Sequence, residues 1–133
     1  MPASVYLANK LLDHQLGKTS FTMPTAYVAL SSTTPTAGGT NVTEPSSGSY
    51  ARKVTAGADW NAAASGATTN ANAITFTTAT GDWVSGANLT YAVLYDASTS
   101  GNMLAYGALT TAKSVLNGDT ASFAAGQISV TLT

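Results

Sequence analysis

The sequence contains no cysteine, one histidine and few charged residues, which make up only 8% of its 133 residues. Without cysteine the chain forms neither a disulfide bond nor a thiolate metal site. Soluble proteins usually carry about 25% charged residues. Solubility therefore has to come from Ser, Thr and Asn side chains and from the backbone.

Positive charge is scarce and scattered, and the formal net charge is −1. The cationic side chains are Lys10, Lys18, Arg52, Lys53 and Lys113. Nucleic-acid binding requires clustered Lys and Arg, so we expect no nucleic-acid partner. Because consecutive strand residues face opposite sides of a sheet, we interpret the adjacent pair Arg52 and Lys53 as an edge or interface feature.

Long hydrophobic runs are also absent. No segment approaches the roughly 20 apolar residues that span a bilayer, and we expect no membrane association. The N-terminal stretch MPASVYLANKLLDHQLGK carries Lys10, Asp13 and His14 within its apolar portion, which interrupts the apolar core of a secretory signal. The sequence thus predicts a soluble protein made without a signal peptide.

Motifs for catalysis or ligand binding are missing as well. His14 is the one histidine, so no His-based metal cluster is available, and on the polar face of a helix we interpret it as solvated. No GxGxxG, P-loop or GxSxG motif occurs. We expect no enzyme, no cofactor and no metal site. A glycosidase pair of carboxylates from distant strands is the enzymatic alternative.

The first part of the chain is amphipathic with a helical period. The apolar half of the wheel in SVYLANKLLDHQLG is formed by Val5, Leu7, Ala8, Leu11, Leu12 and Leu16. Ser4 is a suitable N-cap and Gly17 a suitable left-handed stop. We predict a helix at about residues 4–16. The length suits one domain, which we assign to residues 1–133.

After Gly17 the sequence becomes rich in β-branched and aromatic residues, as is typical of strands. The predicted strands are 26–32, 50–56, 73–79, 89–97, 102–109 and 128–133. The polar stretch DASTSGN predicts a β-hairpin, and Asn117 followed by Gly118 is typical of a type I′ turn.

Two long segments lack a strand pattern. Residues 33–49 contain Pro and Gly, and residues 61–72 are uncharged and of low complexity. Loops longer than about 12 residues are usually functional or mobile. Short strands separated by such turns and loops indicate a mainly all-β fold, an antiparallel β-sandwich or jelly-roll-like domain with one N-terminal α-helix.

Aromatic residues allow two interpretations. Trp60 and Trp83 each follow an Asp and could stack on sugars or anchor an interface. We favour the simpler interpretation that they cap the ends of the sandwich core. Tyr50 and the other strand tyrosines are accounted for by packing in the core or between subunits.

Five segments carry a resemblance to a known family. They are SVYLANKLLDHQLGKTSFTMPTAYVALSSTTPT, EPSSGSYARKVT, AITFTTATGDW, AVLYDASTSGNMLAYGALT and NGDTASFAAGQISVTL. Over nearly its whole length the chain resembles small virion structural proteins of tailed bacteriophages, commonly labelled tail fibre or capsid decoration-type proteins. The resemblance implies a β-rich, oligomeric virion component, made in the host cytoplasm, with no catalytic residues.

Two structural roles follow from the resemblance. A capsid decoration or cement protein clamps capsomers and stabilises the head, typically as a trimer. A tail fibre or receptor-binding module presents loops to the cell surface, often to glycans. Because the chain is short and lacks a repetitive shaft, we favour decoration, with the fibre as the alternative. A glycan-depolymerising enzyme is a distant third.

The expected partners are further copies of the chain, in a homotrimer, and the major capsid protein or other virion proteins. A cell-surface glycan is a partner only for a fibre. A broad apolar helix face with little charge elsewhere places the helix, or residues 33–49, at a contact between chains or with the virion. The candidate interface residues are Leu11, Leu12, Leu16, Tyr50, Arg52, Trp60 and Trp83.

Overall fold

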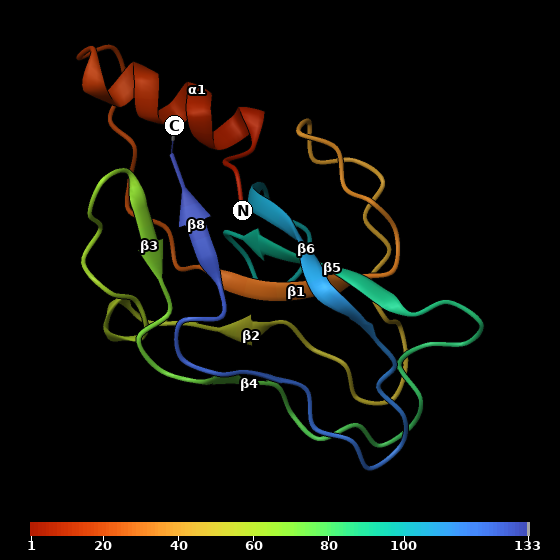
Figure 1. Cartoon of the computed structure of the whole chain (residues 1–133). Helices are drawn as coiled ribbons and strands as arrows, with labels where there is room; N and C mark the ends of the chain where they lie inside the picture. The colour runs from red at the N-terminus through yellow and green to blue at the C-terminus, as the bar shows by residue number, and fades with distance from the viewer. Residues whose placement is uncertain (133) are drawn as a thin grey trace.

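The computed structural model describes residues 1–132 and shows mainly antiparallel β-structure with one helix near the N-terminus (Figure 1). The helix is α1 (Val5–Gln15), and η1 (Gly57–Asp59) is a single 3-10 turn. The strands are β1 (Tyr27–Ser31), β2 (Lys53–Val54), β3 (Ala67–Thr69), β4 (Ile74–Thr75), β5 (Leu89–Tyr95), β6 (Met103–Lys113), β7 (Ser122–Phe123) and β8 (Ser129–Thr131). The predicted all-β class with an N-terminal helix is confirmed.

Helix α1 begins and ends as its capping residues predict. The Ser4 hydroxyl accepts the Leu7 N–H at 3.1 Å, which satisfies one of the unpaired donors of the first turn. Gly17 has a φ of +76°, the left-handed conformation in which glycine is favoured at a helix end. The predicted bounds of 4–16 lie within one residue of the observed helix.

The largest sheet has four strands in the order β2-β1-β5-β6, and all of its neighbours are antiparallel. Strands β5 and β6 form the predicted hairpin. The Asp96 carboxylate accepts the Asn102 N–H at 2.6 Å and the Asn102 side-chain amide at 2.9 Å. Ser100 and Gly101 have positive φ angles of 52° and 75°. The polar turn residues therefore close the hairpin as their chemistry indicates.

A second layer packs on one face of this sheet. It consists of two ribbons, β3 with β8 and β4 with β7, and of irregular segments between them. The main core lies between the layers. Its members from the large sheet include Val28, Leu30 and Leu94, while Ile74 and Ile128 come from the opposite side. The second layer of the predicted sandwich is thus built from short ribbons instead of one continuous sheet.

The other face of the large sheet carries a smaller cluster of buried side chains. Its members are Ala29, Val93, Tyr95 and Met103. Val42 from the 33–49 segment packs against this cluster. Because strand residues alternate between faces, β1 and β5 contribute to both cores, and this explains their nearly continuous apolar sequences.

The N-terminal residues connect the layers, as the positions of β6 and β8 beside the N-terminus in Figure 1 indicate. Ala3 pairs with Ala105 of β6, and Pro2 pairs with Thr131 of β8. The Ser4 N–H donates to the Leu104 carbonyl at 2.8 Å. The strands therefore follow each other in the order β2-β1-β5-β6, N-terminal segment, β8-β3. The sequence pattern does not predict this pairing.

Several strands differ from their predicted extents. The predicted strands 50–56 and 73–79 shrink to β2 and β4, which have two residues each. The prediction 128–133 corresponds to β8, and its last residue, Thr133, lies outside the described residues. Strands β3 and β7 were not predicted, and β3 lies in the low-complexity segment 61–72.

The predicted type I′ turn at Asn117 and Gly118 is wrong. The Asp119 N–H does donate to the Leu116 carbonyl at 2.9 Å, so a tight turn exists. Of the two central residues only Gly118 has a positive φ, at 89°, whereas a type I′ turn requires positive φ at both. The Asn117 N–H donates to the Asp82 carboxylate at 2.9 Å. This contact between residues far apart in the sequence accompanies the different turn geometry.

Candidate interaction surfaces

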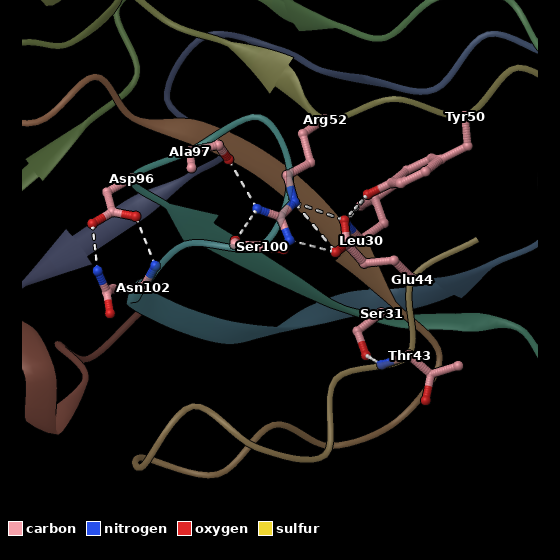
Figure 2. A network of polar contacts seen from close by, with 10 residues as sticks. All are labelled: Leu30, Ser31, Thr43, Glu44, Tyr50, Arg52, Asp96, Ala97, Ser100 and Asn102. Carbon is pink, nitrogen blue, oxygen red and sulfur yellow. Dashed lines mark hydrogen bonds and ion pairs between the residues drawn. The ribbon is translucent and has the colours of Figure 1, made fainter. Parts of the chain in front are cut away.

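Arg52 lies at the centre of a polar network that joins its own segment to Glu44 and to the distant β5–β6 turn (Figure 2). Its guanidinium binds the Glu44 carboxylate through Nε at 3.0 Å and Nη2 at 2.7 Å. Nη1 donates to the carbonyls of Ala97 and Ser100, both at 2.8 Å. The guanidinium carbon also lies 3.6 Å from the centre of the Tyr95 ring, a cation–π contact. Arg52 thus fixes the 33–49 segment and the β5–β6 turn to each other.

Tyr50 extends this network into the core. Its hydroxyl donates to the Glu44 carboxylate at 2.8 Å and accepts the Leu30 N–H at 3.0 Å. Burial, and then the negative charge of Glu44, raise the pKa of Tyr50 far above its ordinary value. Burial alone would lower the pKa of Arg52, but the hydrogen bonds and charge of Glu44 raise it. The network therefore holds a neutral phenol beside an intact ion pair.

The network makes Tyr50 and Arg52 less suitable as interface residues than the sequence suggests. The Arg52 side chain is only 7% exposed, and the Tyr50 hydroxyl already donates and accepts a hydrogen bond within the chain. Either residue could bind a partner only by giving up these contacts, which is costly for a covered charge. We therefore leave both out of the interface proposed below.

The two tryptophans pack into the fold. Trp83 is buried, donates through Nε1 to the Gly48 carbonyl at 2.8 Å, and meets Tyr50 edge to face at 5.1 Å. Trp60 is half-buried against the main core, and its Nε1 donates to the Thr55 hydroxyl at 3.1 Å. These positions agree with the core-packing interpretation, and burial leaves the Trp83 ring closed to a sugar.

Helix α1 uses only part of its apolar half to pack on the protein. Leu7 contacts the main core, and Leu11 is half-buried. Tyr6, which is not part of that apolar half, contacts the core as well. The other apolar residues are exposed, with fractions of 51% for Val5, 55% for Leu12 and 77% for Leu16, and Ala8 is exposed as well. Their helical spacing places these four side chains on one side of the helix. We call Val5, Ala8, Leu12 and Leu16 the helix stripe.

The 33–49 segment is held by hydrogen bonds within itself and to the end of β1. The Ser31 hydroxyl accepts the Thr43 N–H at 3.0 Å, and the Thr33 hydroxyl donates to the Asn41 carbonyl at 2.7 Å. Its tip reaches the start of α1, where the Val5 N–H donates to the Ala37 carbonyl at 2.9 Å. The two elements predicted as contacts are therefore neighbours. We call the helix stripe and the exposed tip residues 36–38 together the contact surface.

A half-open groove of about 1070 Å³ lies between β6 and residues 119–129. Its lining mixes polar side chains, such as Thr110, Ser122 and Gln127, with apolar ones. The apolar members include Leu30, Leu89, Leu109, Val115, Phe123 and Ile128. Residues 108 and 110–113 of β6 are exposed beside it. In the sequence, only the small and polar side chains of the stretch GALTTAK in β6 indicate the exposed strand beside this groove.

The titratable side chains show structural roles. Residues 1–132 hold no group of three or more His, Cys, Asp or Glu placed to bind a metal ion. The carboxylates of Asp59, Asp82 and Asp119 each accept a backbone N–H, from Ala56, Asn117 and Leu116 respectively. The bond from Ala56, followed by one from Asn72, lowers the pKa of Asp59. His14 accepts the Phe21 N–H through Nδ1 at 3.0 Å.

Comparison with known protein families decides the broader assignment. A family model described as Podophage GP4 fiber I protein gp80 matches residues 2–131. The chain belongs to this family. A search among curated proteins gives no match. The family is one of phage fibre proteins, which are virion structural proteins, and it favours the fibre alternative over the capsid-decoration role preferred from the sequence. Within residues 1–132 no helix is long and apolar enough to span a membrane.

Proposed function

We propose that the chain is a structural module of a phage tail fibre, without catalytic activity, and that it docks on neighbouring virion subunits through the contact surface. The family match over residues 2–131 carries the fibre assignment. The carboxylates described above are engaged in turns and loops, and this supports a structural role. Capsid decoration is the competing role, and the experiment below separates the two.

The helix stripe supports docking on physical grounds. Leu12 and Leu16 are exposed on a helix whose other side already packs on the protein. Burying one such side chain contributes about 1.5–3 kcal/mol, and the stripe itself contains no charge that would have to be desolvated. The exposed tip at residues 36–38, which has small side chains and the Thr36 hydroxyl, would form the rim of the same contact.

We further propose a cyclic homo-oligomer, with a trimer as the expected state. Most homo-oligomers have closed rotational symmetry. Identical chains that bind head to tail form a ring when the rotation between neighbours closes the circle. With charged residues at 8% of the chain, little electrostatic repulsion opposes association between apolar surfaces.

Phage particles lacking this protein test the role. For a fibre module, we expect the heads to keep their heat and EDTA stability, adsorption to cells to fail, and antibody labelling of wild-type particles to mark the tail region. Labelling over the whole head, with normal adsorption and heads that lose DNA at lower temperature, would instead establish decoration and overturn the fibre proposal.

A further inference from the structure

We propose that the groove beside β6 binds residues 22–25 of a second copy of the chain as an added β-strand. Three observations carry this inference: a strand edge that is unpaired within residues 1–132, a groove along this edge with several apolar side chains in its lining, and an exposed segment without main-chain partners. The proposal does not depend on where in the virion the protein sits.

The outer edge of β6 is only partly paired. The Ser4 N–H donates to the Leu104 carbonyl, and the Tyr106 N–H donates to the Pro2 carbonyl. Even-numbered residues of this part of β6 therefore direct their main-chain groups outward, because these groups alternate along a strand. The pairing with β5 stays regular to Ala108, so Ala108 faces outward too. Within residues 1–132 its N–H and carbonyl have no hydrogen-bond partner on that side.

The N-terminal segment shows that this edge accepts a strand. Pro2 and Ala3 pair along β6 up to Tyr106. Met1 then packs on Gly107, where a Cβ atom would lie only 2.7 Å from the Met1 Cγ. Met1 also borders the groove. The groove thus lies along the same edge of β6 on which the N-terminal segment pairs, and apolar side chains form part of its lining.

Residues 22–25 have the properties of a donor strand. They connect α1 to β1 outside any helix or strand (Figure 1). Met23 is 89% exposed, and the four residues carry no charge. Within the described part of the chain, their main-chain groups make no hydrogen bonds. Exposed, unpaired edges and segments of this kind favour strand addition.

The donor and the edge fit each other chemically. If Met23 and Thr25 direct their main-chain groups toward β6, Pro24 directs its ring nitrogen away, where its missing N–H costs nothing. The flexible Met23 side chain can pack against the apolar part of an irregular groove. Because donor and groove are different surfaces of one chain, each copy can give and receive a strand, and such head-to-tail contacts close into a ring or extend into a filament.

Single cysteines provide the test, because the natural chain has none. One preparation carries Met23→Cys, and a second, tagged preparation carries Ala108→Cys. They are mixed and treated with a short bis-maleimide cross-linker. We expect a cross-linked heterodimer of the tagged and untagged chains. The matched control replaces Ala108→Cys by Lys53→Cys, an exposed position on β2 at the opposite edge of the large sheet, and should give little product.

Two further variants connect the contact to assembly. Met23→Asp and Ala108→Pro should lower the sedimentation coefficient of the purified protein while leaving its circular dichroism and melting temperature unchanged. A heterodimer yield equal to that of the Lys53→Cys control, or oligomers unaffected by Met23→Asp, would overturn the inference. Neither result would bear on the fibre proposal, which the phage particles test separately.

Discussion

At the scale of single residues, Arg52 and most of the carboxylates make contacts that hold loops together. Arg52 joins Glu44 to two carbonyls of the β5–β6 turn and stacks on Tyr95. A covered guanidinium with this many partners leaves several acceptors unpaired when it is removed. Its stabilising role therefore exceeds that of an ordinary surface ion pair.

Replacing Arg52 should show this directly. We expect Arg52→Ala to lower the free energy of unfolding by about 2–4 kcal/mol, and Arg52→Lys to recover only part of it, because an ammonium cannot bind Glu44 in a bidentate manner. Urea denaturation measures both. The neighbouring exposed Lys53 is the control, and Lys53→Ala should stay within about 0.5 kcal/mol of the wild type. Equal losses at both positions would contradict the role of the network.

Tyr50 gives the protein a dependence on alkaline pH. Burial first, and then the charge of Glu44, raise its pKa above the ordinary value of 10. Above about pH 10 the unfolded chain loses this proton while the folded chain keeps it, so stability falls as pH rises, by up to about 1.4 kcal/mol per pH unit. Below that pH the contribution is fully present.

The comparison of wild type with Tyr50→Phe tests this dependence. We expect the loss of unfolding free energy between pH 9 and pH 11, measured with urea, to be smaller in the variant. Tyrosinate absorbance gives an independent check, because one tyrosine should ionise only when the wild-type protein unfolds. Ionisation of all six tyrosines in the native protein would refute the assignment.

At the scale of secondary-structure elements, the sequence predicts best what local chemistry decides. The helix and the β5–β6 hairpin carry their own capping and turn residues, such as Ser4, Gly17 and Asp96, and both formed as predicted. Strands β3 and β7 become strands only because distant segments pair with them. No local pattern marks such pairings.

The candidate interface residues show the same difference between what a local pattern predicts and what depends on distant contacts. Helical periodicity predicted an apolar face, but whether Leu7 or Leu12 is covered depends on how α1 docks, which the period alone does not specify. For Arg52, strand alternation suggested an edge position. Its partner Glu44 comes from the long 33–49 segment, whose path over the sheet has no sequence signature.

Helix α1 depends on Ser4 for its start and for its attachment to β6. The hydroxyl caps Leu7 and donates to the Met103 carbonyl, and the side chain is buried. Ser4→Ala should lower the free energy of unfolding by about 1–3 kcal/mol, from the lost cap and the unpaired carbonyl. Thermal and urea unfolding measure this loss. Ser20→Ala, at an exposed position after the helix, should have almost no effect, and an equally small effect at Ser4 would contradict the role of the cap.

At the scale of the whole molecule, the two central strands of the large sheet, β1 and β5, are covered on both faces. The most exposed large apolar side chains, Leu12, Leu16 and Met23, lie on α1 and the segment after it. This uneven distribution is what a module needs when its body must be stable alone and its ends must bind neighbours.

Rebinding of purified protein to phage particles that lack it tests the contact surface. We expect wild-type protein to rebind and the double variant Leu12→Ser with Leu16→Ser to bind at least about 10-fold more weakly, because each lost leucine removes more than about 1 kcal/mol of burial. Both side chains are exposed in the free chain, so the melting temperature of the free chain should change little.

Leu7→Ser is the control on the covered side of α1. Leu7 packs on the main core, and its loss should lower the stability of the free chain by about 2 kcal/mol or more. Undiminished rebinding by the double variant would show that α1 faces solvent in the virion, and would remove the helix stripe from the interface.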